Sequence, residues 1–130
     1  KGYSVRSSKQ GSTLGRALVS TYMGLSGALV LVFIVVHIFD MRMVRGTYDS
    51  LYDHVHEVLG VGWKAWLYMV GSIFVGWHLW HGFQSSFRSL GLGHAKYSPA
   101  LEKTGMMLSI AVTIGFVSIP LWIYFIKGGL

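Results

Sequence analysis

Three long stretches without any charged residue constrain the fold of this chain more than any other feature. Each stretch holds 23 residues that include no Asp, Glu, Lys or Arg, and together they cover residues 17–39, 65–87 and 104–126. A helix of 23 residues extends for roughly 34 Å, which is enough to cross the ~30 Å hydrocarbon core of a bilayer with some tilt. The pattern predicts an all-α membrane protein with three transmembrane helices.

The predicted helices extend a little beyond the uncharged stretches. We place them at about residues 14–39, 63–90 and 101–126, within one transmembrane domain over 14–126. Residues 1–13 form a polar N-terminal segment without the apolar core of a signal peptide. Because the chain starts with Lys, we expect it to be a processed or partial polypeptide.

The two connections between the predicted helices differ in character. Residues 40–62 are polar but carry apolar side chains at near-helical spacing, which indicates a short interfacial helix on the membrane surface; these are Leu51, Val55, Val58 and Leu59. Residues 91–100 contain glycines that can end a helix and a Ser-Pro pair that can start the next one.

The net charge of +6 is explained by membrane topology better than by a nucleic-acid partner. Seven basic residues lie before the first span or between the second and third spans, and four lie on the opposite side. The positive-inside tendency therefore predicts a cytoplasmic N-terminus and an outer C-terminus in the cell (inner) membrane. A nucleic-acid site would need these residues on one surface, and the spans scatter them. The chain has no Cys, so it supplies no thiolate ligand or disulfide.

Several residues are expected to shape the spans and their packing. A stripe of small residues in the first span would let another helix approach closely; it comprises Ser20, Gly24 and Ala28. An aromatic belt is expected at the outer end of the second span, formed by Trp63, Trp66 and Tyr68. Pro120 should kink the third span and free a carbonyl group near residue 116.

Six histidines fall into two groups according to their position. Three lie in the connections, where we expect solvated surface residues: His54, His56 and His94. The other three, His37, His78 and His81, lie inside the uncharged spans. Ionisable residues at membrane depth are costly and mark functional sites, although an imidazole can also serve as a simple interhelical hydrogen-bonding group.

Small residues near two of these histidines favour a large, flat ligand. Gly71 and Gly82 share the helix face of His78, and Gly27 lies close to the face of His37. A porphyrin between helices needs such smooth strips beside an imidazole that reaches its iron, and neutral imidazole is a common haem ligand. Zinc would require four ligands at one point, and the spans offer too few.

The two candidate ligands differ in depth. His37 lies roughly 13 Å from the centre of the first span toward the outer face, and His78 lies roughly 3 Å from the centre of the second span toward the inner face. Two imidazoles on one metal need nitrogens only about 4 Å apart. His37 and His78 are therefore expected to bind two different haems, each needing a second ligand from helices outside this chain.

At this point the sequence resembles a known family. The run HLWHGFQSSFRSLGLGHAKYSP, followed by GFVSIPLWIYF, is similar to the di-haem cytochrome b anchor of succinate dehydrogenase and fumarate reductase. The segments GLSGALVLVFIVVHIFD and TYDSLYDHV resemble the third helix of that family and its outer connection. The resemblance covers nearly all of residues 14–126 and implies the last three helices of a bundle of five.

The resemblance implies a function and a set of ligands. His37 matches the family's ligand to the distal b haem, and His78 matches the ligand to the proximal one, with His81 as an alternative. The chain would then pass electrons between the iron–sulfur subunit of a complex and a quinone in the membrane. A flavoprotein would be the other partner subunit, and the resemblance implies menaquinone as the quinone. The chain would carry no flavin chemistry itself. At the inner face, Arg16, Arg88 and Lys103 are expected to meet haem propionates or the soluble subunits. At the outer face, Arg42 and Arg45 are expected to meet the distal haem.

Two other interpretations remain open at this stage. The chain could be the cytochrome b subunit of a hydrogenase or formate dehydrogenase, which would be distinguished by its co-purifying subunits. It could also be a haem-free helical scaffold in which the histidines only join helices.

Overall fold

The fold is described from a computed structural model, which covers residues 13–43, 49–91 and 96–127. These residues form four α-helices and two π-helical segments and include no strand. The elements in chain order are α1 (Thr13–Ile38), η1 (Phe39–Met43), α2 (Leu51–Gly60), α3 (Gly62–Ser89), α4 (Ser98–Leu121) and η3 (Trp122–Lys127). The prediction of an all-helical chain is confirmed.

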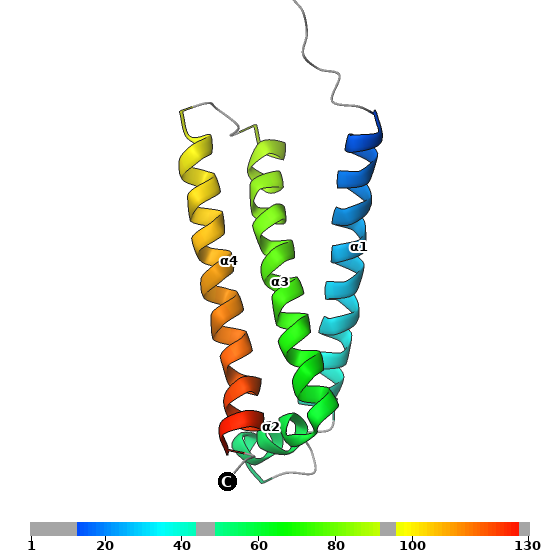
Figure 1. Cartoon of the computed structure of the whole chain (residues 1–130), viewed down its shortest axis with the longest axis vertical. Helices are drawn as coiled ribbons and strands as arrows, with labels where there is room; N and C mark the ends of the chain where they lie inside the picture. The colour runs from blue at the N-terminus through cyan, green and yellow to red at the C-terminus, as the bar shows by residue number, and fades with distance from the viewer. Residues whose placement is uncertain (1–12, 44–48, 92–95, 128–130) are drawn as a thin grey trace, which may run out of the picture.

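The three long helices lie side by side, and α2 crosses one end of them (Figure 1). The middle helix is α3, which packs against both α1 and α4. The axes of α2 and α3 differ by 98°, so α2 lies almost perpendicular to the long helices. We call the end covered by α2 the outer end, following the topology expected from the charges.

Two segments of the described residues are by themselves long and apolar enough to cross a membrane. They are Ser20–Met43 and Ser98–Lys127, and the bent pair of α2 and α3 makes a third if it counts as one span. Of the long helices, α3 is the least apolar, since it carries Lys64, His78 and His81. The expectation of apolar helices of spanning length is therefore confirmed for two segments. It also holds for a third if α2 and α3 are counted as one span.

The helix α2 occupies the connection where a short amphipathic helix was predicted. Ser50 caps its N-terminus, because the Ser50 hydroxyl accepts a hydrogen bond from the Asp53 amide at 3.1 Å. Val58 and Leu59 are buried and join Tyr68 and Ile123 in a hydrophobic cluster. The best-packed apolar cluster of the described residues thus lies at the outer end, where α2 closes the bundle.

The helix α4 passes Pro120 without ending there. Pro120 is buried, and the α-helical pattern continues to Leu121 before it widens into the π-helical segment Trp122–Lys127. Proline lacks the amide proton, and its ring presses on the carbonyl group four residues earlier, so the regular ladder of hydrogen bonds is broken. The final segment of the third span is thus π-helical, and the kink expected at Pro120 stays a prediction.

The small-residue stripe of α1 does not receive a helix from the described part of this chain. Ser20, Gly24 and Ala28 are all exposed, and a Cβ atom built on Gly24 would meet nothing within 4 Å. The expected close approach therefore does not occur between these elements. The contact with α3 uses the neighbouring residues Ser26 and Gly27 instead.

Gly76 is a point of close contact between α3 and α4. The Ser109 hydroxyl of α4 donates a 2.6 Å hydrogen bond to the Gly76 carbonyl oxygen. A Cβ atom at Gly76 would overlap the Thr113 hydroxyl and would lie 3.3 Å from the Ser109 carbonyl oxygen. The absence of a side chain at position 76 therefore allows these helices to pack closely.

We expect Gly76→Ala to destabilise the protein. The added methyl group must displace Thr113 and press on the backbone of α4, which should cost about 1–3 kcal/mol as overpacking of a close interface. Thermal unfolding of the purified protein in detergent measures the effect. Gly115→Ala is the matched control, since a Cβ atom there would meet nothing within 4 Å. Equal melting temperatures for the two variants would contradict the prediction.

Candidate functional site

His78 faces α1, the neighbouring long helix. Its Nδ1 atom lies 3.2 Å from the hydroxyl oxygen of Ser26. The Ser26 hydroxyl in turn donates its only proton to the Met23 carbonyl oxygen at 3.0 Å. With the Ser26 proton on the Met23 carbonyl, the hydroxyl oxygen acts as the acceptor toward Nδ1, and His78 in this arrangement carries its proton on Nδ1 and a lone pair on Nε2.

Gly27 makes room for the His78 ring. A Cβ atom at Gly27 would lie 3.3 Å from Cε1 and 3.9 Å from Nε2 of His78. The first distance is tighter than an ordinary van der Waals contact, so a larger residue would press on the imidazole. The sequence analysis associated Gly27 with His37, whereas the structure places it against His78. The long helices are offset so that the glycine of one helix meets the histidine of the other.

His37 lies near the outer end of α1. Its ring centroid is 6.2 Å from that of Phe33 and 5.8 Å from that of Tyr68. The residue is exposed overall, and it lines a hollow of about 290 Å³ whose walls come from α1, η1, α2, α3 and α4. Most of the other lining side chains are apolar, including Ile34, Leu59 and Phe116.

Gly71 contributes to the surroundings of His37 rather than to those of His78. A Cβ atom at Gly71 would overlap the ring of Phe33, which itself lies beside His37. Gly82 differs, since a Cβ atom there would meet nothing within 4 Å. Of the three glycines expected beside a cofactor, two therefore accommodate aromatic or imidazole rings of a neighbouring helix, and Gly82 borders open space.

The contacts of His37 and His78 place the two imidazoles at different levels of the bundle. His37 is level with Tyr68 of α3, whereas His78 lies ten residues further along the same helix. Ten residues of α-helix correspond to roughly 15 Å. Two ligands of one metal need nitrogens about 4 Å apart, so this geometry agrees with separate sites for the two histidines.

His81 lines a second hollow, of about 320 Å³, between α1 and α3 on the inner side of His78. Its Nε2 atom accepts a hydrogen bond from the Trp77 indole nitrogen, and its ring stacks on Trp80 with centroids 5.0 Å apart. Indole nitrogen is a donor only, so this bond uses the lone pair of His81 Nε2. Among the residues that the structure describes, none hydrogen-bonds Nε2 of His78. Of these two histidines, His78 is therefore the one whose Nε2 lone pair is available to a metal.

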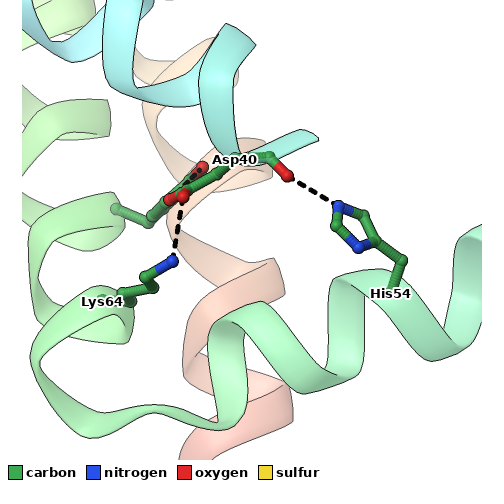
Figure 2. Close-up of polar contacts among 4 residues, drawn as sticks. Asp40, His54 and Lys64 are labelled. Carbon is green, nitrogen blue, oxygen red and sulfur yellow. Dashed lines mark hydrogen bonds and ion pairs between the residues drawn. The ribbon is translucent and has the colours of Figure 1, made fainter. Parts of the chain in front are cut away.

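A buried polar network lies at the outer end (Figure 2), and one of its members, Tyr68, has its ring 5.8 Å from that of His37. Asp40, in the π-helical segment η1, is only 6% exposed and forms an ion pair with the Lys64 amine at 2.8 Å. The Tyr68 hydroxyl donates to the other carboxylate oxygen at 3.4 Å, and the Asp40 carbonyl oxygen accepts a 2.7 Å bond from His54 Nε2. The network joins η1, α2 and α3.

The network corrects two expectations from the sequence. His54 was expected on a solvated surface, but it is fully buried, because α2 folds across the bundle and turns this residue inward. Tyr68 was expected in an aromatic belt, but it is 6% exposed and packs in the outer hydrophobic cluster. Trp63 and Trp66 are exposed, as a belt requires.

The remaining candidates are less informative. His56 is half-buried and packs on the Tyr52 ring, with centroids 4.2 Å apart. Arg88 lies 3.7 Å from Glu102 in an exposed ion pair, and it also lines the inner hollow. Arg42 and Lys103 are exposed. His94, Arg45 and the side chain of Arg16 lie outside what the structure describes.

His78 and His37 each offer a single imidazole at its own level of the bundle, which is what a haem shared with another helix would require of this chain. Within residues 13–43, 49–91 and 96–127, no three His, Cys, Asp or Glu side chains gather to hold a metal ion. A site with several protein ligands from the described residues, such as zinc requires, is therefore not formed. His78 has an oriented Nδ1 and a glycine beside its ring, and His37 borders an apolar hollow. Both are suitable for a single imidazole–iron bond.

Two residues that connect elements of the bundle did not stand out in the sequence. Ser26 looked like an ordinary small residue of an apolar span, and Asp40 looked like the charge that ends it. Their partners lie 52 and 24 positions away in the chain, so no local pattern indicates them.

These features define a structural class of protein. The chain belongs to the all-helical proteins whose long apolar helices could cross a membrane, and it carries histidines at two levels of its bundle. Comparison with protein-family models, curated proteins and solved structures found no match.

Proposed function

We propose that this chain is part of the membrane-anchor cytochrome b of a succinate:quinone oxidoreductase, a succinate dehydrogenase or fumarate reductase. In this role it holds two b haems in the bilayer through His37 and His78. The observation that carries the proposal is the pair of single imidazoles roughly 15 Å apart, each beside a glycine or an apolar hollow. The sequence resemblance described above supplies the identity of the enzyme.

The work of the chain's own residues follows from their positions. Haem b, when bound, supplies a one-electron redox couple. His37 and His78 would each hold one haem iron through an imidazole nitrogen, and two helices outside this chain would supply the other two ligands. Gly27 gives space at the His78 ring, while the apolar side chains of Ile34, Leu59 and Phe116 line the hollow beside His37. Apolar burial of this kind and the orientation of the imidazole are the main means by which a protein sets a haem potential.

The proposed orientation follows the distribution of basic residues. The N-terminal segment and the connection 91–100 would face the cytoplasm, toward the iron–sulfur and flavoprotein subunits, and α2 would lie at the outer surface. Electrons would pass between those subunits and a quinone in the bilayer, with menaquinone favoured by the resemblance. Arg88, which lines the inner hollow, is the best placed of the basic residues to meet a haem propionate.

Purification of the intact complex followed by a reduced-minus-oxidised spectrum tests the proposal. We expect a b-type signal from two haems and co-purification of a flavoprotein. A b-type signal with a molybdenum or nickel subunit would instead identify another membrane oxidoreductase. Without any haem signal, the chain would be a scaffold, for which the Ser26–His78 bond between α1 and α3 is the supporting observation.

A further inference from the structure

We infer that Ser26 is a positioning residue, which holds His78 in the tautomer that ligates iron and lowers the reduction potential of the haem bound there. The inference rests on the proposed function and goes beyond it, because it assigns a role to Ser26, which is not itself a haem ligand. It concerns only this chain's own residues.

The hydrogen-bond arrangement leaves the Ser26 hydroxyl one role toward His78. Ser26 is 8% exposed, and its proton is directed at the Met23 carbonyl oxygen within its own helix. A hydroxyl has one proton and two lone pairs, so while its proton stays on the Met23 carbonyl the oxygen accepts from His78 Nδ1. Protonation of Nδ1 leaves Nε2 unprotonated, and Nε2 is then the atom available to a metal.

The same bond affects the electronic character of the ligand. An imidazole that donates its second N–H to an acceptor becomes a stronger base toward its metal. A more basic axial ligand stabilises oxidised iron more than reduced iron, so the potential decreases. No comparable arrangement serves His81, whose Nε2 accepts from Trp77. Ser26 therefore distinguishes His78 from the histidine one turn away.

The proposal is tested in the assembled complex by a redox titration that resolves the two haems. We expect Ser26→Ala to retain both haems and to raise the potential of the haem that depends on His78. The ratio of reduced to oxidised haem at a fixed applied potential should rise up to about tenfold, which equals about 59 mV for one electron. Ser26→Thr keeps a hydroxyl and should stay close to the wild type.

A matched control separates this effect from a general loss of packing. Ser109 is also 8% exposed, but its hydroxyl bonds the Gly76 carbonyl oxygen between α3 and α4. Ser109→Ala should leave the potential of the His78 haem unchanged.

The possible outcomes are distinct. Loss of the haem in Ser26→Ala with retention in Ser26→Thr would also support the inference. An unchanged potential in Ser26→Ala, an equal shift in Ser109→Ala, or haem loss in both Ser26 variants would overturn it. Absence of haem from the wild-type complex would refute the proposed function itself, so the two failures can be told apart.

Discussion

Replacing His78 by Ala is expected to remove one of the two b haems from the complex and leave the other in place. Under the proposed function, the His78 imidazole would be the one bond from this chain to that iron, and the methyl group of Ala offers no replacement ligand. The loss should appear as a reduced-minus-oxidised signal of about half the wild-type amplitude per complex. His37→Ala should remove the other haem, and the double variant should remove both.

His81→Ala is the matched control for this prediction. His81 lies three residues from His78 on the same helix, and its Nε2 already accepts a bond from Trp77. We expect both haems to persist in this variant. Haem loss in His81→Ala with retention in His78→Ala would transfer the ligand role to His81. Retention of both haems in all three single variants would exclude the proposed ligands altogether.

Replacing Asp40 by Ala is expected to loosen the outer end of the bundle. The substitution leaves the Lys64 amine and the Tyr68 hydroxyl without their shared acceptor. Removing one partner of a fully buried pair costs about 3–5 kcal/mol. The Lys64 side chain is 24% exposed and can recover some hydration, so we expect about 2 kcal/mol here. Thermal unfolding of the purified protein in detergent measures the loss.

An exposed ion pair of the same chain serves as the control for Asp40. Arg88 and Glu102 are 3.7 Å apart with side chains 68% and 55% exposed. Glu102→Ala should therefore change stability by less than about 0.5 kcal/mol. If Asp40→Ala were as stable as Glu102→Ala, the buried network would not stabilise the outer end.

The apolar surfaces of Ser20–Met43 and Ser98–Lys127 need lipid or other helices around them. None of the most apolar window of Ser20–Met43 is buried within the described structure, and the corresponding value for Ser98–Lys127 is 17%. Such surfaces are stable only against lipid or other helices. This agrees with the proposal that two helices outside this chain complete the haem sites.

The sequence alone was sufficient to predict the elements and the residues with unusual chemistry. Uncharged stretches of 23 residues require helices, since backbone polar groups in lipid must bond internally. The apolar spacing over Leu51–Gly60 indicated a short helix, and the structure forms one there. His37 and His78 stood out because imidazoles are rare in such spans. Each of these inferences uses only local composition and periodicity.

The tertiary structure decided which of these residues meet. Gly27 was associated with His37 by helix face but lies against His78, and Gly71 accommodates Phe33 beside His37. His54 was assigned to solvent but is buried under Asp40. These contacts depend on the rotation and offset of each helix relative to its neighbour. Side-chain packing across the whole bundle sets this rotation and offset. The hydrophobic period of a single helix does not predict either of them.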